Sequence, residues 1–298
     1  MLVARTIKKT RKIISAVKSK HKTIGFVPTM GALHDGHLSL VRAARETCDF
    51  VVVSIFVNPV QFGPKEDFRK YPKMFSRDKR LLQKEKVDLI FYPSKAEMYT
   101  KDFSTYVEET YLSESLCGVM RPGHFKGVCT VVAKLFNIVS PDAAYFGSKD
   151  YQQACIIKRM ARDLNFNVQV KVLPIVRENS GLAMSSRNAY LSREERKDTL
   201  VLFESLELAK KLIKDGEKDA KKIINKIRKL IISKKSAKIS YIRIVDPMNL
   251  RPVDKIRGKT LIALAVYIGK TRLIDNIVGG INRALSYKGE VCREIGIK

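Results

Sequence analysis

Short apolar runs alternate with segments of helical periodicity through the first 175 residues. Five runs are almost continuously apolar, which is typical of strands buried on both faces of a parallel sheet. These runs cover residues 24–27, 50–57, 89–92, 143–146 and 168–173. Apolar residues recur at helical spacing in the segments 6–20, 38–47, 77–86, 128–139 and 150–165. Strands that alternate with helices predict an α/β fold with a doubly wound, Rossmann-like parallel sheet.

A change of pattern near residue 176 predicts a second, smaller domain. The loop at 177–183 carries glycine and polar residues. We place the boundary before it, between a first domain of residues 1–175 and a second of residues 176–298. The second domain is expected to be α+β. Its predicted elements are helices rich in Lys and Glu at 193–214 and 217–233, and strands at 240–245 and 261–268.

The first central strand leads into the sequence PTMGALHDGH, residues 28–37. A strand that feeds a helix lies at the carboxyl edge of a parallel sheet, where ligands bind. Free amides and the helix dipole favour a phosphate there. His34 and His37 could donate a hydrogen bond or a proton to a phosphate oxygen, and Gly36 permits close approach between them. Taken alone, the motif would also fit a glycine turn with two surface histidines.

Two further motifs also carry residue types that bind phosphate. After the strand at 143–146 come Gly147-Ser148-Lys149-Asp150, in which Lys149 offers a point charge to a phosphate and Asp150 an acceptor for ribose hydroxyls. The segment Ser185-Ser186-Arg187 offers two hydroxyls and a guanidinium to outer phosphates. Taken alone, the first motif would also fit an ordinary helix start, and the second would also fit a solvated turn. His124 fits either a ligand contact or a structural hydrogen bond.

Composition reduces the number of functional classes that fit the chain. The formal net charge of +27 could indicate nucleic acid or an anionic substrate, but the lysines are scattered, and we interpret most of them as solvated helix faces. The five cysteines contain no C-x-x-C pair, which favours free thiols in a reducing cytoplasm. No apolar run approaches membrane-spanning length. The absence of G-x-G-x-x-G argues against a nicotinamide cofactor.

Six motifs, in order and at suitable spacing, resemble the pantothenate synthetases. They are PTMGALHDGH, SIFVNPVQF, YP, RPGHFKGVCTVV, YFGSKDYQQ and LAMSSRNAYLS, and the late TRLIDN fits too. The family is a branch of the nucleotidylyl transferase and class I aminoacyl-tRNA synthetase-like superfamily. The resemblance implies that ATP and pantoate form pantoyl adenylate and pyrophosphate, and that β-alanine then attacks the acyl carbon to give pantothenate and AMP.

The resemblance also implies the role of each site residue. ATP is expected to contact Met30, Gly31, Ala32, Leu33, His34, Asp35, Gly36, His37, Gly147, Ser148, Lys149, Asp150, Val176, Met184, Ser185, Ser186 and Arg187. Within this set, His34, His37 and Lys149 are the expected catalytic residues, with Val176 and Met184 beside adenine. Gln61 and Gln153 are expected to hold pantoate.

A Mg²⁺ ion that bridges the ATP phosphates is implied as well, with Asp78 contributing to it. Members of the family usually carry two acids at this point, whereas this chain has Arg77 and Asp78. Ser148 likewise stands where an acid commonly precedes the lysine. Both departures remove negative charge near the site.

The expected enzyme is a cytoplasmic homodimer whose partners are pantoate and β-alanine, with neither nucleic acid nor membrane. Two alternative hypotheses for the function remain. One is a nucleotidylyl transferase that acts on another small carboxylate or phosphate substrate and stops at the activated intermediate. The other is a basic RNA-binding module derived from a synthetase-like fold, which salt-sensitive RNA binding without turnover would favour.

Overall fold

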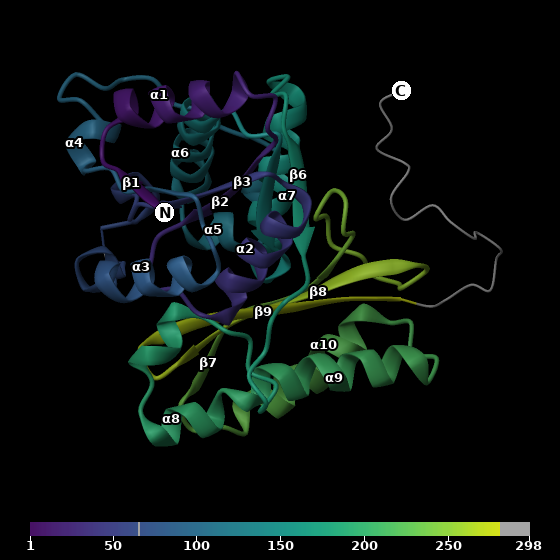
Figure 1. The fold of residues 1–298 in the computed structure, drawn as a ribbon. Coiled ribbons are helices and arrows are strands. Elements are labelled where there is room, and N and C mark those ends of the chain that lie inside the picture. Colours follow the sequence, from purple (N-terminus) through teal and green to yellow (C-terminus); the bar gives the residue numbers. More distant parts are fainter. Residues whose placement is uncertain (65, 281–298) are drawn as a thin grey trace.

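A six-stranded parallel sheet forms the first half of the chain. The computed structural model describes residues 1–64 and 66–280. The strands are β1 (Leu2–Ala4), β2 (Ile24–Thr29), β3 (Phe50–Ile55), β4 (Leu89–Phe91), β5 (Ala143–Gly147) and β6 (Gln169–Leu173), in the spatial order β1-β4-β3-β2-β5-β6. All neighbouring pairs in this sheet are parallel. The predicted doubly wound α/β fold is therefore confirmed (Figure 1).

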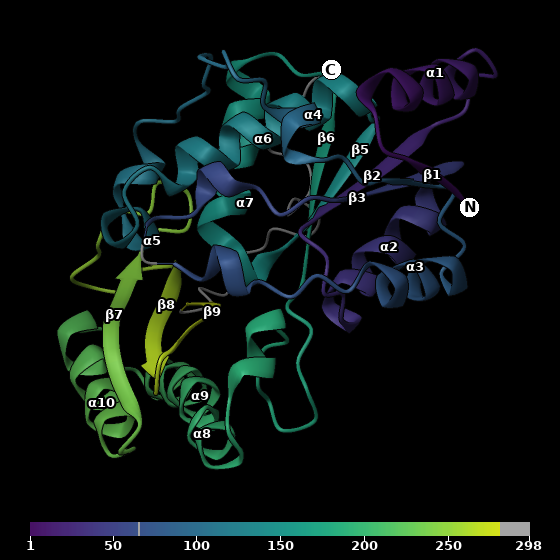
Figure 2. The ribbon, with the colours of Figure 1, turned by 90° about the vertical axis from the view of Figure 1, so that its left-hand side faces the viewer.

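Helices cover both faces of this sheet. They are α1 (Ile7–Lys18), α2 (Asp35–Thr47), α3 (Phe75–Lys84), α6 (His124–Val139) and α7 (Tyr151–Asp163), with the short α4 (Lys95–Met98) and α5 (Leu116–Met120) between α3 and α6. Figure 2 shows α1 and α6 on one side of the strands and α2 and α3 on the other. Each face has its own buried apolar cluster.

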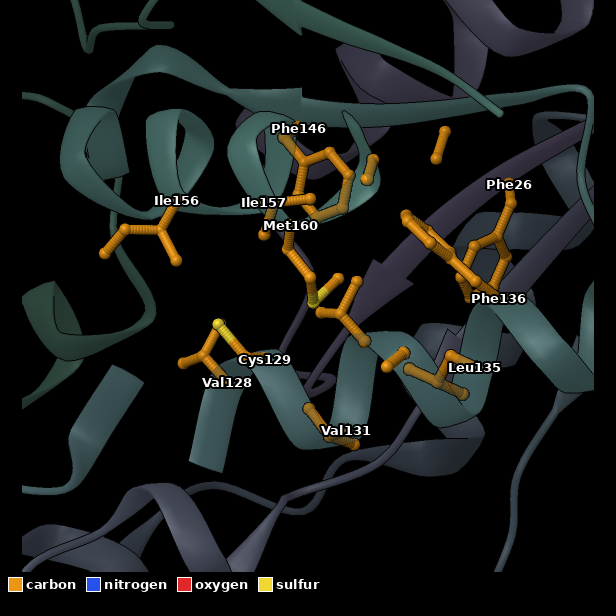
Figure 3. Packing of buried hydrophobic residues seen from close by; sticks show 14 of the residues in the cluster. Phe26, Val128, Cys129, Val131, Leu135, Phe136, Phe146, Ile156, Ile157 and Met160 are labelled. Atoms are coloured by element: carbon orange, nitrogen blue, oxygen red, sulfur yellow. The ribbon is translucent and has the colours of Figure 1, made fainter. Parts of the chain in front are cut away.

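Helix α6 is the most deeply buried helix in this half, because apolar residues surround almost its entire circumference. It packs with α7 against the strands, and Figure 3 shows Phe136 and Met160 reaching toward Phe26 and Phe146. A helix that is apolar all round belongs in a core rather than at a surface. Its first turn faces the cleft described below, so the core fixes one wall of that cleft.

The central strands β2 and β5 are neighbours, with Phe26 opposite Ala144. From β2 the chain proceeds outward to β3 and β4 on one side, and returns to β5 and β6 on the other. The strand order therefore reverses between β2 and β5. Ligands of open α/β sheets bind at such a switch point, outside the carboxyl ends of the strands.

A second, three-stranded antiparallel sheet lies beneath the first domain (Figure 1). Its strands are β7 (Ala237–Val245), β8 (Lys259–Ile268) and β9 (Thr271–Gly280), and its helices are α8 (Arg193–Asp198), α9 (Leu200–Lys214) and α10 (Ala220–Ile232). Alternate residues of β8 serve two cores: Leu261 and Ala263 pack against the first domain, and Ile262 and Leu264 pack against α9 and α10. This sheet is thus a layer shared between both parts.

The structure differs from the predicted elements in four places. Strand β9 follows β8 after a two-residue turn and was not expected, nor was β1, a three-residue strand at the sheet edge. The predicted helix 193–214 is divided into α8 and α9 at Thr199. Helix α2 begins at Asp35 rather than Leu38, which makes His34 its N-cap residue.

Among the described residues, no helix has both the length and the apolar character required to cross a membrane. The part of the predicted second domain beyond residue 280, with Cys292, lies outside the described residues. Cys48, Cys117, Cys129 and Cys155 are free thiols, as predicted. Burial raises the pKa of Cys129 to about 12, so this thiol stays protonated.

Candidate functional site

A cleft opens at the carboxyl ends of β2 and β5, between the two parts of the chain. Fourteen of the predicted site residues line it: Met30, His34, Gly36, His37, Gln61, Gly147, Lys149, Asp150, Gln153, Val176, Met184, Ser185, Ser186 and Arg187. They come from five separate segments of the sequence. The parallel sheet brings these segments together because successive strand ends emerge at one edge.

His34 and His37 form a close pair at the start of α2. Their ring centroids are 4.1 Å apart, and the backbone N–H of His34 donates to Nδ1 of His37 at 3.4 Å. Burial, followed by the nearby charge of Lys149, lowers the pKa of His34 to about 4. Burial, followed by the charges of His34 and Lys149, lowers the pKa of His37 to about 3. Both imidazoles are therefore neutral near pH 7.

The tautomer of His37 follows from this contact. Because Nδ1 accepts a hydrogen bond, the single proton of the neutral ring lies on Nε2, which can donate to a ligand. Nδ1 of His34 is buried and has no partner among the described residues. A buried nitrogen without a partner is costly, and a ligand in the cleft is a ready source of the missing hydrogen bond.

Lys149 enters the same cleft from the end of β5. It lies in a short 3₁₀ turn (Ser148–Asp150) that joins β5 to α7, and its side chain is 20% exposed. Its Nζ is 3.9 Å from Asp150 Oδ1. Its positive charge contributes to the lowered pKa values of both histidines. One full positive charge and two neutral donors therefore converge, as binding of a polyphosphate requires.

Gln61 is held with its amide in a defined orientation. Asn58 is 1% exposed, and its Nδ2 donates to Gln61 Oε1 at 3.1 Å and to the Gly127 carbonyl at 3.0 Å. Its own oxygen accepts from the Tyr99 hydroxyl at 2.8 Å. Gln61 Nε2 consequently points to Met30 Sδ, 3.2 Å away at the cleft wall. Sequence reasoning did not assign Asn58, although it lies in the quoted motif SIFVNPVQF.

A second set of contacts fixes the backbone of Gln61. Nδ1 of His124 lies 2.8 Å from the Gln61 carbonyl, and Nε2 of His124 lies 2.9 Å from Arg121. Both nitrogens of His124 are thus occupied, which supports the structural interpretation of this residue. Gly127 permits the close packing, since a Cβ there would lie 2.6 Å from Gln61 Cα. Gln153, in α7, lines the same cleft.

The remaining cleft walls are formed by the segment after β6. The backbone N–H of Met184 donates to the Val176 carbonyl at 3.0 Å, so these two apolar residues lie side by side. Arg187 makes a two-pronged ion pair with Asp67, at 2.9 and 2.8 Å. The Ser186 hydroxyl lies 3.0 Å from that of Tyr71. Two apolar residues and a guanidinium-bearing loop of this segment therefore border the cleft.

Asp78 lies in α3, the helix that follows Tyr71-Pro72, as expected, but its carboxylate is engaged by the backbone. It is 0% exposed, and its two oxygens accept hydrogen bonds from the Ala32 and Leu33 amides, each at 2.9 Å. Gly31 (φ +82°) and Ala32 (φ +51°) both have left-handed backbones, which cost energy in Ala32. Asp78 stabilises this strained loop. The expected contribution of Asp78 to a magnesium site therefore finds no support in this geometry.

The same contact changes the expectation for four ATP-binding residues. The amides of Ala32 and Leu33 face Asp78 rather than a phosphate, and the Leu33 side chain packs in the apolar cluster with α2. Gly31 lies beside the Asp78 carboxylate, and Asp35 lines a neighbouring shallow pocket with His34. None of the four lines the cleft itself. Ser148 does not line it either.

The described residues contain no group of three or more His, Cys, Asp or Glu side chains placed to hold a metal ion. Asp150 is the carboxylate that borders the cleft without a strong ion pair, its nearest cation being 3.9 Å away. One carboxylate can supplement the phosphate oxygens and water that Mg²⁺ prefers, but it cannot enclose the ion by itself. The residues present therefore do not form a protein-built magnesium site.

Comparison with known proteins shows the family of this chain. The family model for pantoate-beta-alanine ligase matches residues 2–278. A pantothenate synthetase from Thermotoga petrophila is 57% identical over 280 residues, 94% of this chain and 100% of the relative. A pantothenate synthetase from Fervidobacterium nodosum is 56% identical over 278 residues, which cover 93% of this chain and 99% of the relative.

Solved structures agree as well. A pantothenate synthetase from Thermus thermophilus superposes with a TM-score of 0.88 at 43% identity, covering 93% of this chain and 99% of that one. A pantoate-beta-alanine ligase from Francisella tularensis, complexed with beta-gamma ATP and beta-alanine, gives 0.77 at 37% identity, covering 93% and 97%. On the strength of its sequence, its fold and its cleft, this chain belongs to the pantoate–β-alanine ligase family, the pantothenate synthetases.

Proposed function

We propose that the cleft condenses pantoate with β-alanine at the expense of ATP, through a pantoyl adenylate. The observation that carries this proposal is the convergence of His34, His37 and Lys149 with Gln61 and Gln153 in one cleft. The first group suits a polyphosphate, and the two neutral amides suit the hydroxyls and carboxylate of pantoate. Both substrates would thus lie at the switch point of the sheet.

In the first step, a carboxylate oxygen of pantoate attacks the α-phosphorus of ATP. The bond from that phosphorus to the bridging oxygen breaks, and pyrophosphate leaves. Negative charge grows on the phosphate oxygens during this step. Lys149 and the Nε2–H of His37 are donors held in place before reaction, so they stabilise the transition state without reorganisation. Arg187 would take the outer phosphates once these compete with Asp67.

In the second step, the amine of β-alanine attacks the acyl carbon of the adenylate. The bond between that carbon and the phosphate oxygen breaks, AMP leaves, and the amine nitrogen loses a proton. A carboxylate becomes a good acyl donor only when its oxygen becomes a good leaving group, and adenylation supplies this. No nucleophile from the protein is needed. The cleft must instead exclude water, so that the adenylate survives until the amine arrives.

Magnesium would enter with the nucleotide rather than occupy a site on the protein. Its preferred ligands are phosphate oxygens and water, with few protein carboxylates. The burial of Asp78 and the absence of an acidic cluster among the described residues support this assignment. We further propose a cytoplasmic homodimer and a division between the two domains at residues 175/176, after β6 ends at Leu173.

The experiment that tests the reaction is an assay for AMP release with and without pantoate and β-alanine. The proposal predicts that sustained release of AMP requires both pantoate and β-alanine. Turnover that proceeds without β-alanine would favour a nucleotidylyl transferase that stops at the activated intermediate. RNA binding that weakens with salt, with no release of AMP under any combination, would favour the RNA-binding reading.

A further inference from the structure

Strand β9 supports the turn that carries Lys149. The side-chain amide of Asn276, in β9, donates to the Lys149 carbonyl at 2.8 Å and to the Ser148 carbonyl at 3.0 Å. Asn276 is 7% exposed and does not line the cleft. It contacts the turn through these two backbone carbonyls, and it lines an adjoining pocket together with Lys149 and Arg187. Two hydrogen bonds to consecutive carbonyls restrict both the position and the tilt of a short turn.

The neighbouring residue Asp275 extends this support to the nucleotide segment after β6. It is 2% exposed, and its carboxylate accepts two hydrogen bonds from Arg177, at 2.7 and 2.9 Å. One of its oxygens also accepts the backbone N–H of Asn276 at 2.8 Å. Arg177 in turn donates to the Gly181 carbonyl at 2.9 Å. The pair Asp275–Asn276 is thus linked to Val176 and Met184 through Arg177 and to Lys149 through the turn.

From these contacts we infer that Asn276 is a positioning residue for Lys149 in adenylate formation. This inference rests on the proposed function. The printed hydrogen bonds of the Asn276 side chain go to the backbone of the turn that carries Lys149, so the effect of Asn276 on the reaction is expected to pass through Lys149. The strand lies in the second sheet, so the second part of the chain places a charge that the first part supplies. Asn276 lies in the motif TRLIDN, which the resemblance alone left without a role.

The chemistry of the side chain makes the inference specific. Both carbonyls are acceptors, so the residue opposite them must donate twice, as the Nδ2 group of asparagine does. Aspartate has nearly the same shape but offers no donor when ionised. In Asn276→Asp, a carboxylate would face two carbonyl oxygens and lie beside Asp275. The turn would be pushed away, and Lys149 would move with it. Misplacement of a reacting group by about 1 Å can cost roughly 100-fold in rate.

The test is a double-mutant cycle with Lys149, measured as pantoate-dependent exchange of labelled pyrophosphate into ATP. Lys149→Ala should lower the exchange rate at least about 100-fold. Asn276→Asp should lower kcat roughly 10- to 100-fold, with a smaller change in KM for ATP. If Asn276 acts through Lys149, then Asn276→Asp in the Lys149→Ala background should change the rate less than about threefold, since coupled residues are not additive.

Two further variants keep the test decisive. Asn225→Asp makes the same chemical change on the exposed face of α10 and should leave exchange unchanged. Asn276→Ser retains a hydroxyl donor and should show a smaller loss with the same non-additivity, which covers the case in which the aspartate variant fails to fold. Fully additive losses would overturn the inference while the role of Lys149 stands. Wild-type exchange in Lys149→Ala would instead overturn the proposed role of Lys149 itself.

Discussion

Asn58 Nδ2 donates to Gln61 Oε1 at 3.1 Å, and this one contact decides which end of the Gln61 amide faces the cleft. The oxygen end is turned inward to Asn58, so the N–H₂ end is left for a ligand beside Met30. An N–H₂ group suits a carboxylate or hydroxyl oxygen, which is what pantoate offers. Asn58 lines the cleft as well, but its Nδ2 group is occupied by Gln61 and Gly127, so it acts on a ligand through the orientation of Gln61.

We predict that Asn58→Asp raises the KM for pantoate about tenfold, close to the ~1.4 kcal/mol of one hydrogen bond. Aspartate keeps the acceptor for Tyr99 but cannot donate to Gln61, so the Gln61 amide should rotate and present its oxygen to the cleft. Steady-state kinetics should show a KM for ATP within about twofold of wild type. The matched control is Asn137→Asp, an exposed position of α6. Equal increases in both KM values would contradict the orientation argument.

A second prediction concerns Asp78. In Asp78→Asn, one of the two acceptors becomes a donor that faces a backbone N–H, and a buried unsatisfied group costs about 1–3 kcal/mol. The free energy of unfolding should fall by that amount, and the KM for ATP should rise because the strained loop before His34 loses its anchor. The exposed change Asp102→Asn serves as the control. Unchanged stability combined with a higher magnesium requirement would instead make Asp78 a metal ligand.

The buried histidines predict how stability depends on pH. Burial lowers the pKa of His124 to about 4, as it does for the pair in α2. A group with a lowered pKa binds fewer protons folded than unfolded, so its stabilisation is present above about pH 6.5 and is lost as pH falls toward 4. Each such histidine should add up to about 1.4 kcal/mol per pH unit to the slope.

Urea unfolding of His124→Gln at several pH values between 4.5 and 7 measures this contribution. Glutamine does not titrate, so the decline of the free energy of unfolding with acid should be shallower in the variant than in wild type, whatever its stability at pH 7. Parallel curves for the two proteins would show that His124 does not contribute to the pH dependence.

His37 gives a fourth prediction. Removing the Nε2–H donor in His37→Ala should cost roughly 3 kcal/mol in the adenylation step, on the scale of a lost oxyanion donor. The affinity for pantoate should change much less, because the donor faces the reacting phosphate. Single-turnover formation of adenylate, together with equilibrium binding of pantoate, separates the two effects. Adenylation at a near wild-type rate would remove His37 from the mechanism.

Much of the fold could be predicted because its strands are continuous apolar runs with helices between them. The exceptions have physical causes. Strand β1 has only three residues, too few for any periodicity. Strand β9 alternates poorly because it serves two partners: Ile274 packs toward the first domain, whereas Asp275 and Asn276 bind polar groups. Helix α2 starts at Asp35, before its apolar face begins at Leu38.

The phosphate-site motifs could be proposed from the sequence because glycines, histidines and a lysine gather directly after strands, whereas Gln61, Gln153, Val176 and Met184 were implied only by the family resemblance. The supporting residues could not be assigned. Asp78 and Asn58 each act through partners that are distant in sequence or in loops, and a single acid or amide has no local pattern. Asp78 was expected at a metal because the resemblance to the family implies an acid at that position. Only the three-dimensional path of the loop at 31–33 shows that its oxygens are already engaged.

The central claim is that adenylation of pantoate is a separate half-reaction without a covalent enzyme intermediate. Its most direct test is the exchange of labelled pyrophosphate into ATP by the wild-type chain. With ATP, magnesium and pantoate present and β-alanine absent, we predict sustained exchange, and omission of pantoate should abolish it. Exchange that requires β-alanine, or a mass increase on the protein that survives denaturation, would contradict the mechanism.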